Sequence, residues 1–302
     1  MKKEAQKQAN KQKTQNKKKG PIWPFILLLL VGLGLLAYPL STQVYNFWLS
    51  HQKIQSFQKA AGKLSDAEVK KRLRLARAYN ASLLSPGQQA GFDDPFSKKE
   101  KKAGVAAYAK MLELEENIGY IDLPKLHEEL PIYAGTSESV LQKGIGHLAG
   151  SSLPVGGKST RAVLTGHRGL PNSRLFTDLP RMKKGDVFYV HNLGQTLAYK
   201  VDQIKVIKPT QVDQLKIVKG KDLCTLMTCT PYMINTHRLL VTGHRIPYNP
   251  KAEAKAKERS RNRLFWIIIA ILLPVLAIII FIWHKKRKKK KKAKADKEKE
   301  QE

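Results

Sequence analysis

The 302-residue chain has few cysteines and lacks several motifs that mark common kinds of site. Its two cysteines, Cys224 and Cys229, are too few for a disulfide framework. Because they stand five apart in one predicted strand, their side chains point to opposite faces, and a bond between them would need a sharp bend. No Cys/His set has zinc spacing, no carboxylate cluster has calcium spacing, and no glycine-rich loop suits a phosphate. The sequence therefore predicts unbridged thiols, no metal and no cofactor.

Acidic residues are also scarce, with 24 Asp and Glu against 55 Lys and Arg and a formal charge of +31. Residues 1–20 hold eight lysines and one glutamate, and residues 284–302 hold eleven basic and four acidic residues, so each end carries +7. Such runs beside apolar spans are typical of cytoplasmic ends, where they can meet anionic headgroups. Residues 21–250 keep +13 but lack the interleaved aromatic and basic residues of a stacking platform. We therefore predict no nucleic-acid partner.

Two long runs, Ile22–Leu40 and Leu264–Trp283, contain no charged residue. Each is long enough to cross a hydrocarbon core about 30 Å thick at about 1.5 Å per residue. We predict two transmembrane helices, with both termini cytoplasmic and the middle of the chain extracellular. A cleavable signal peptide is the alternative for the first run. That run is longer than a usual apolar signal region, and no clear small-residue cleavage site flanks it.

The middle of the chain is predicted to be helical first and β-rich afterwards. Helices are expected at Val44–Lys59 and Asp66–Leu84, with Ser65 and Glu68 as a capping box for the second. The pattern turns to strands from Tyr108, with one helix near Ser137–Lys143. Short β-type runs are expected at residues 116–126, 128–135, 159–167, 186–194, 196–210, 222–229 and 237–246. Seven or eight such strands indicate an α+β, mainly β fold: a closed barrel of about eight strands with N-terminal helices, flanked by two transmembrane helices.

The predicted segments follow one another along the chain. They are a basic cytoplasmic tail (1–21), a transmembrane helix (22–40), an extracellular helical region (41–107) containing a loop at 91–97, a β-barrel domain (108–250), a linker (251–263), a second transmembrane helix (264–283) and a polybasic cytoplasmic tail (284–302). The linker has a net charge of +4 on the predicted outer side, which opposes this orientation. The eight consecutive basic residues at 285–292 should have the larger effect and keep the C-terminal end cytoplasmic.

Three side chains at predicted strand ends form a candidate nucleophilic site. Cys229 ends one strand and Arg238 begins the next, after a turn cluster at Pro231–Asn235. His167 ends another β-rich run, RAVLTGH. A cysteine thiolate attacks acyl carbons well, and a guanidinium offers several donors in a fixed fork to an oxyanion.

These residues also carry a resemblance. The stretches TLMTCTP, NTHRLLVTGHR and TGHRGLP resemble the sortase family of Gram-positive surface transpeptidases. The similarity runs from Gly119 to Arg245 and includes GIGHLAGSSLPVGG and LFTDLPRMKKGDVFYV. It implies a sortase-type barrel in which Cys229, His167 and Arg238 are the catalytic cysteine, histidine and arginine.

A second motif, Asp94-Pro95-Phe96, resembles the Asp-Pro-aromatic lid of class C, pilin-polymerising sortases. The proline fixes its own φ and biases Asp94 toward extended backbone, so the carboxylate and the ring stand on a short stiff element. The resemblance implies that Phe96 covers the cysteine sulfur and that Asp94 lies near a catalytic base or cation. Without it, the motif is typical of an acidic surface turn.

Other residues of the same types have plainer interpretations. Cys224, between Leu223 and Thr225, is expected in the core. His147, His237 and His244 are the other candidates for the histidine, and Arg161, Arg168 and Arg245 are expected to be surface arginines. His244 shares the face of Arg238 but lies roughly 20 Å along the strand at about 3.3 Å per residue.

The resemblance implies a membrane-anchored enzyme that cleaves an LPXTG-type sorting signal between Thr and Gly and joins it to a pilin lysine. Its partners would be pilin subunits and membrane lipids. One alternative is a housekeeping sortase that attaches proteins to peptidoglycan, or a hydrolase that passes the thioester to water. The alternative of another class is a basic membrane-tethered module that binds a polyanion.

Overall fold

The computed structural model describes residues 23–85, 94–96, 107–258, 269, 273, 274 and 280. The chain divides into two compact units. One comprises Met1–Trp48 with Pro171–Ser173, and the other comprises Leu49–Leu170 with Arg174–Glu302. In the 91–97 loop the structure describes residues 94–96, which are the Asp94-Pro95-Phe96 motif.

The first helix, α2 (Trp23–Gly62), is 40 residues long. It joins two elements that the sequence predicts separately, the apolar run 22–40 and the helix at Val44–Lys59. No Lys, Arg, Asp or Glu occurs in it before Lys53. Within the described part of the chain, no helix combines the length and apolar character that crossing a membrane requires. The second predicted span, 264–283, lies almost wholly outside the described residues.

Helix α3 (Asp66–Ser82) begins where its sequence predicts. The hydroxyl of Ser65 accepts a hydrogen bond from the amide of Glu68 at 3.2 Å, which is half of the expected capping box. The Glu68 carboxylate instead accepts a bond from Arg72 Nε at 2.8 Å, one turn further along the helix. Leu73 and Ala76, three residues apart on one face, are buried in the main core, so this face of α3 packs against the barrel domain.

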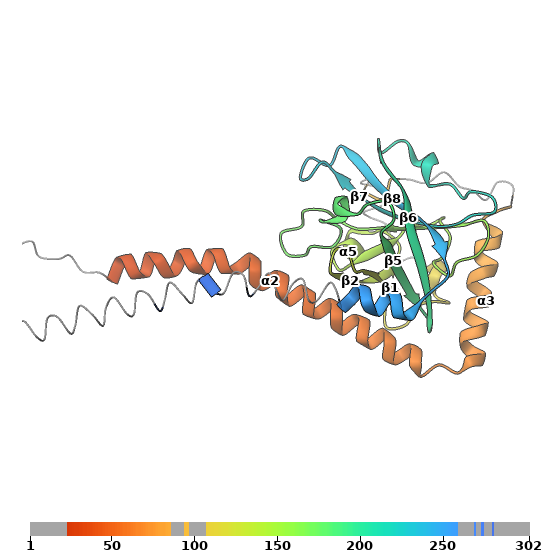
Figure 1. Cartoon of the computed structure of the whole chain (residues 1–302), viewed down its shortest axis with the longest axis horizontal. Coiled ribbons are helices and arrows are strands. Elements are labelled where there is room, and N and C mark those ends of the chain that lie inside the picture. The colour runs from red at the N-terminus through yellow and green to blue at the C-terminus, as the bar shows by residue number, and fades with distance from the viewer. Residues whose placement is uncertain are drawn as a thin grey trace, which may run out of the picture. The chain divides into compact units, whose positions relative to one another are not determined.

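Eight strands form a closed barrel in the order β1-β2-β3-β4-β7-β8-β6-β5 (Figure 1). This confirms the predicted barrel. Seven strands coincide with predicted β-type runs: β1 (Asn117–Leu123), β2 (Glu128–Ala134), β4 (Thr160–Thr165), β5 (Val187–Asn192), β6 (Gln195–Ile207), β7 (Asp222–Thr230) and β8 (His237–Ile246).

The eighth strand, β3 (Ile145–His147), is too short to show a sequence period. It forms because it lies between β2, with which it pairs in parallel, and β4, with which it pairs antiparallel. Short helix α5 (Glu138–Leu141), inside the predicted 137–143 segment, precedes it. One-turn 3₁₀ segments occupy Ala107–Ala109, Leu179–Arg181 and Val212–Leu215. The start of the β region predicted at Tyr108 is therefore too early.

The barrel interior is filled by one large cluster of buried apolar side chains. Cys224 belongs to it and is fully buried, as predicted, and burial raises the pKa of its thiol well above the usual range. Residues 250–258 are helical, and all but the first of them lie in the predicted linker 251–263.

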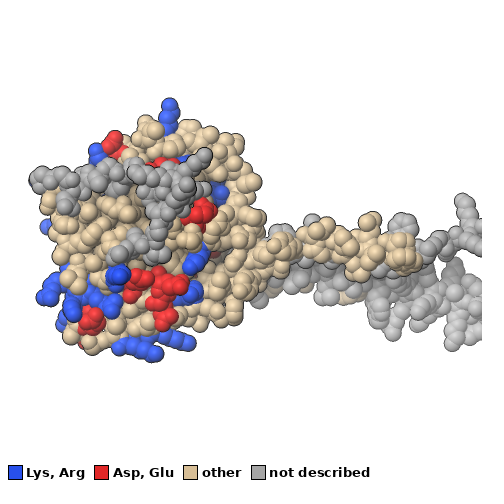
Figure 2. Space-filling view, turned by 180° about the vertical axis from the view of Figure 1, so that it is seen from behind, with Lys and Arg blue, Asp and Glu red and all other residues tan. Residues whose placement is uncertain are grey.

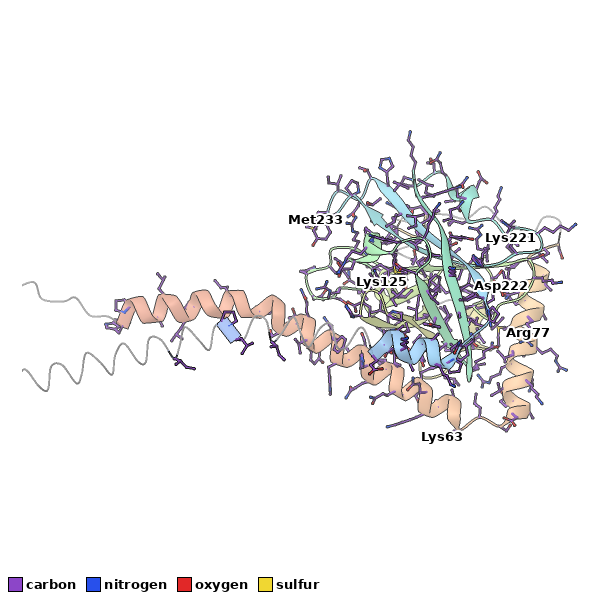
Figure 3. All side chains as sticks on the ribbon, viewed as in Figure 1. Lys63, Arg77, Lys125, Lys221, Asp222 and Met233 are labelled. Atoms are coloured by element: carbon purple, nitrogen blue, oxygen red, sulfur yellow. The ribbon has the colours of Figure 1, made fainter. Side chains whose placement is uncertain are left out.

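Strand β7 spans the barrel, so its two ends define two ends of the domain. Asp222 begins the strand, and Met233 lies in the β7–β8 connection at the opposite end (Figure 3). An open pocket of about 510 Å³ lies at the Asp222 end, beside Arg77 and Arg245. Cys229 lies at the other end, so this pocket is separate from the candidate nucleophile.

Candidate active site

Strands β7 and β8 place Cys229 and Arg238 directly opposite one another. The antiparallel register pairs Cys229 with Arg238 and Thr230 with His237, next to the connection formed by residues 231–236. Side chains at opposite positions of such a pair have Cβ atoms about 5 Å apart. Both side chains are buried, with 5% of Cys229 and 6% of Arg238 exposed. The predicted approach of thiol and guanidinium therefore holds.

His167 reaches the same place because strand β4 runs parallel to β7. The last paired residues are Thr165 and Met227, and the amide of Gly166 donates to the Met227 carbonyl at 3.1 Å. Thr228 Oγ1 donates to the Gly166 carbonyl at 2.7 Å. Arg168, the residue after the histidine, donates from its guanidinium to Thr230 Oγ1 at 3.0 Å.

The same offset of residues thus continues through the histidine and sets it beside Cys229. Adjacent strands lie about 4.8 Å apart. Gly166 lets Ile145 and Phe176 pack against the chain just before the histidine, since a Cβ there would lie 2.6 Å from Ile145 Cδ1 and 3.0 Å from the Phe176 ring. The Phe176 amide, which donates to the His167 carbonyl at 3.1 Å, fixes the chain just beyond the strand.

The Asp94–Phe96 segment lies against these residues. The Asp94 carboxylate accepts hydrogen bonds from Arg238 Nε at 2.8 Å and Nη2 at 2.6 Å. The Phe96 ring lies 5.4 Å from the His167 ring and 5.0 Å from the Arg238 guanidinium carbon. A surface turn would make none of these contacts. The expected position of Phe96 over the sulfur of Cys229 stays a prediction.

The charge of Arg238 is stabilised by its neighbours although the side chain is only 7% exposed. Burial opposes the charged form, but the hydrogen bonds that Arg238 donates to Asp94 and the field of Cys229 more than compensate, so the pKa of Arg238 is raised above its usual value. Further bonds from Nη1 to the carbonyls of Asn235 and His237 hold the guanidinium in place. Arg238 is therefore a fixed cation beside the thiol.

Sequence reasoning missed Glu138. It is the first residue of α5, and its Oε1 lies 3.4 Å from Nε2 of His167. No periodicity or spacing links position 138 to 167, because the contact depends on how α5 packs. The only available signal was an acidic residue at the start of a predicted helix.

The three alternative histidines have other environments. His147 is fully buried, contacts Tyr108 Oη through Nδ1 at 2.5 Å and the Ser152 carbonyl through Nε2 at 2.8 Å. Burial lowers its pKa to about 4, so it is a neutral core residue at pH 7. His237 Nδ1 lies 3.0 Å from the hydroxyl of the adjacent Thr236, and His244 pairs with Asp202 at 3.0 Å. None of these contacts involves Cys229.

The expectation that Arg161 is a surface arginine is wrong. Only 5% of it is exposed, and its Nη1 donates to the Gln214 carbonyl at 3.0 Å and to Thr225 Oγ1 at 3.3 Å. Strand β4 is covered on both sides, so an arginine there can be kept only where acceptors meet it. Arg168 and Arg245 are partly buried and lie 5.6 and 5.8 Å from tyrosine rings.

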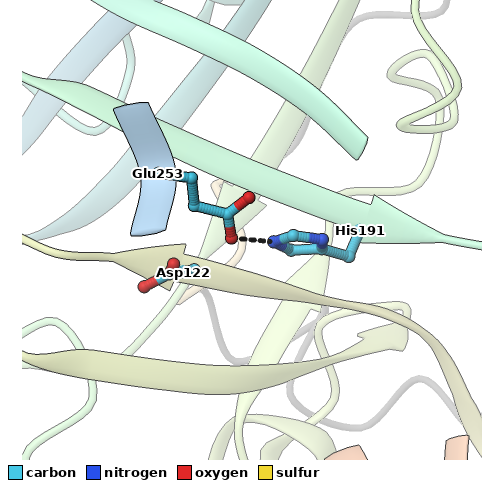
Figure 4. Close-up of side chains that lie close together, drawn as sticks. All are labelled: Asp122, His191 and Glu253. Carbon is cyan, nitrogen blue, oxygen red and sulfur yellow. Dashed lines mark ion pairs between the residues drawn. The ribbon is translucent and has the colours of Figure 1, made fainter. Parts of the chain in front are cut away.

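One group of side chains could be mistaken for a metal centre. Ligand atoms of Asp122, His191 and Glu253 lie within 4.8 Å of one another (Figure 4). The ammonium of Lys257 lies 3.1 Å from Asp122, 3.2 Å from Glu253 and 2.8 Å from Glu129. Lys257 is therefore the cation of this group, which fastens the 250–258 helix to β1 and β5.

The pKa values of Asp122 and Glu253, two carboxyls of this group, are shifted in opposite directions. Burial raises the pKa of Asp122 to about 7 although Lys257 opposes the shift. Burial also acts on Glu253, but hydrogen bonds from His191 and Tyr248 outweigh it and lower its pKa to about 2. The pKa of Lys257 is raised, because Asp122 and Glu129 outweigh its burial.

Comparison with known proteins agrees with this geometry. A model of the sortase domain matches residues 121–246. The crystal structure of sortase C-1 from Streptococcus pneumoniae is 54% identical, with a TM-score of 0.63 over 66% of this chain and all of that one. A pilus-related sortase C of Group B Streptococcus is 53% identical, with a TM-score of 0.61 over 64% of this chain and 97% of that one.

More distant relatives carry the same family name. Sortase A of Bacillus anthracis is 31% identical over 134 residues, which are 44% of this chain and 61% of that protein. The stretch 121–246 includes His167, Cys229 and Arg238, so the family match covers all three strand-end residues. The chain therefore belongs to the sortase family of cysteine transpeptidases.

Proposed function

We propose that this enzyme is a class C sortase that polymerises pilins on the cell surface. The single observation that carries the proposal is the contact of the Asp94–Phe96 segment with both Arg238 and His167, beside Cys229. Two class C structures that are more than 50% identical support the same class. In this proposal Cys229, His167 and Arg238 are the catalytic residues.

In the acylation step, the Cys229 thiolate attacks the threonine carbonyl carbon of an LPXTG-type signal. The guanidinium of Arg238 donates to the developing oxyanion, where a fixed buried donor is worth much more than in water. The carbon–nitrogen bond to glycine then breaks. His167, as imidazolium, protonates the departing amine, and a thioester to Cys229 is left.

In the second step, the side-chain amine of a pilin lysine attacks the thioester carbonyl. The thiolate of Cys229 departs, and neutral His167 takes the proton that the amine loses. The product is an isopeptide bond between two subunits, and the enzyme returns to its starting protonation state. An acceptor that reaches the thioester before water does is required, since water would make the reaction hydrolytic.

The Asp94–Phe96 segment is proposed to act as a lid over this site. Its carboxylate occupies the guanidinium that acylation needs, so substrate binding requires the segment to leave. The sequence adds a proposed location: the apolar runs 22–40 and 264–283 anchor the enzyme in the cell membrane, both basic ends are cytoplasmic and the barrel is extracellular. Membrane lipids and pilin subunits are the proposed partners.

Mass spectrometry tests the thioester directly. The full-length protein is incubated with an LPXTG peptide, and the expected result is an adduct on Cys229 whose mass equals the peptide up to threonine less one water. Hydroxylamine should release it as the hydroxamate. Absence of the adduct, with intact protein and excess peptide, would contradict the proposed acylation.

The acceptor separates the pilin-polymerising class from a housekeeping sortase. With purified pilin as the only acceptor, we expect a ladder of covalent multimers that persists in hot detergent. A single product joined to a peptidoglycan amine, with no ladder, would favour the housekeeping function. The polyanion-binding alternative predicts salt-dependent oligonucleotide binding. It finds little support on the face in Figure 2, where acidic and basic side chains lie side by side on the barrel.

A further inference from the structure

Helix α5 presents a carboxylate to the proposed acid–base histidine. Oε1 of Glu138 lies 3.4 Å from His167 Nε2, and the same oxygen accepts a hydrogen bond from Gln142 Nε2 at 2.7 Å. Val140 and Leu141 are buried and anchor the helix, so the carboxylate is offered from a fixed element. The His167 side chain is only 14% exposed, whereas that of Glu138 is 38% exposed.

The ionisable side chains at the site form two pairs. Asp94 faces the Arg238 guanidinium, and Glu138 faces the His167 imidazole. The Phe96 ring contacts both the His167 ring and the Arg238 guanidinium. An imidazolium at His167 would share the Phe96 ring with the cation of Arg238, and the Asp94 carboxylate is already engaged by that guanidinium. A neighbouring carboxylate favours the charged form of a histidine.

We propose that Glu138 is a positioning residue that holds His167 in the orientation and protonation state needed to protonate the departing amine. The proposal rests on the proposed function of His167. When the Asp94–Phe96 segment leaves for substrate, Asp94 leaves Arg238, but Glu138 stays because it belongs to α5. The carboxylate therefore supports the imidazolium in the state that reacts.

Two pH profiles of full-length Glu138→Gln test this role. One is the rate of thioester formation with the LPXTG peptide. Its alkaline limb should move to lower pH, and the rate at pH 7 should fall about fivefold, as expected for a partly exposed ion pair. The other is the alkylation of Cys229 by iodoacetamide, followed on the Cys229 peptide. Its rise should move to higher pH, because a less stable imidazolium supports less thiolate.

Matched variants separate this effect from a loss of charge in general. Glu116→Gln removes a carboxylate that is 58% exposed and pairs with Lys53 and Lys143, and both profiles should stay as in the parent. Glu138→Asp keeps the negative charge but places it one methylene further from His167. Both of its pH profiles should lie between those of the parent and of Glu138→Gln. Salt at 1 M should reduce the difference between parent and Glu138→Gln, because it screens a partly exposed pair.

Unchanged profiles in Glu138→Gln, or equal displacement in Glu116→Gln, would overturn the positioning role. The two readouts also separate it from the proposed function. If the parent forms no thioester while Glu138→Gln still displaces the alkylation profile, the transpeptidase proposal fails and the Glu138–His167 coupling stands. If the thioester forms and neither profile moves, only the role of Glu138 fails.

Discussion

The carboxylate of Asp94 accepts two hydrogen bonds from the guanidinium of Arg238, although 144 residues of chain separate them. Such two-point pairs are among the strong hydrogen bonds of proteins. Only 14% of the Asp94 side chain and 7% of the Arg238 side chain are exposed, so solvent weakens the pair little. The guanidinium proposed to bind the substrate carbonyl is therefore already occupied, and a substrate must displace Asp94.

Breaking this contact should expose the nucleophile. In Asp94→Ala or Phe96→Ala, we expect iodoacetamide to alkylate Cys229 faster than in the parent, on the order of tenfold for a contact worth about 1.4 kcal/mol. Timed quenching and mass spectrometry of the Cys229 peptide measure the rate. Equal rates in the three proteins would show that the segment does not protect the thiol.

Arg238→Lys should separate charge from geometry. The lysine keeps a positive charge but cannot offer the planar fork that grips Asp94 and an oxyanion. We expect thioester formation to fall about a hundredfold, as for the loss of an oxyanion donor, while alkylation of Cys229 becomes faster because Asp94 is held less firmly. Steady-state kinetics and alkylation on one preparation check both. Parental acylation in this variant would exclude an oxyanion role.

The two cysteines should respond differently to the same substitution. Cys229→Ala is expected to abolish the thioester adduct without loss of folding. Cys224→Ala removes a buried sulfur from the core, so it should keep the adduct and lose about 1 kcal/mol of unfolding free energy. Adduct mass and urea unfolding measure the two effects. An inactive but folded Cys224→Ala protein would show that Cys224 has been misjudged.

The buried carboxyl of Asp122 should make stability fall as pH rises. Its pKa is about 7 in the folded state against 3.8 for the ordinary group, so the folded state holds its proton more tightly than the unfolded state does. The corresponding stability is present below about pH 4 and is lost as pH rises toward 7. Asp122→Asn removes this dependence.

Relative to the parent, the unfolding free energy of Asp122→Asn should therefore rise by about 2–4 kcal/mol between pH 4 and 7, at about 1.4 kcal/mol per pKa unit. Urea unfolding at pH values from 4 to 8 measures the difference. Glu116→Gln, on the exposed surface, is the control and should parallel the parent. A difference between Asp122→Asn and parent that stays constant with pH would contradict the expected titration.

Most of the barrel could be predicted because seven of its strands are long enough for their apolar and β-branched runs to be recognised. Strand β3 could not, since three residues carry no period and its pairing partners lie elsewhere in the chain. The continuity of α2 was missed for a related reason. Local composition predicted two elements, whereas the structure has one helix that runs through the junction.

The sequence predicted which residues form the candidate site, but it did not predict which side chains surround them. Cys229, His167 and Arg238 stand at strand ends marked by turn residues and by a family resemblance, so the chain itself singles them out. Arg161 was misjudged because burial of an arginine depends on acceptors supplied by other segments, here Gln214 and Thr225. Glu138 was missed because its distance from His167 is set by the packing of α5.

By itself, the sequence determined which groups can react and roughly where each strand begins and ends, because strand periodicity, turn chemistry and charge are local properties. Only the tertiary structure decided what faces those groups. Parallel pairing of β4 with β7 carries the chain of His167 to the level of Cys229, and the return of residues 94–96 gives Arg238 its carboxylate. Contacts of this kind arise from closing the barrel, which joins segments far apart in the chain.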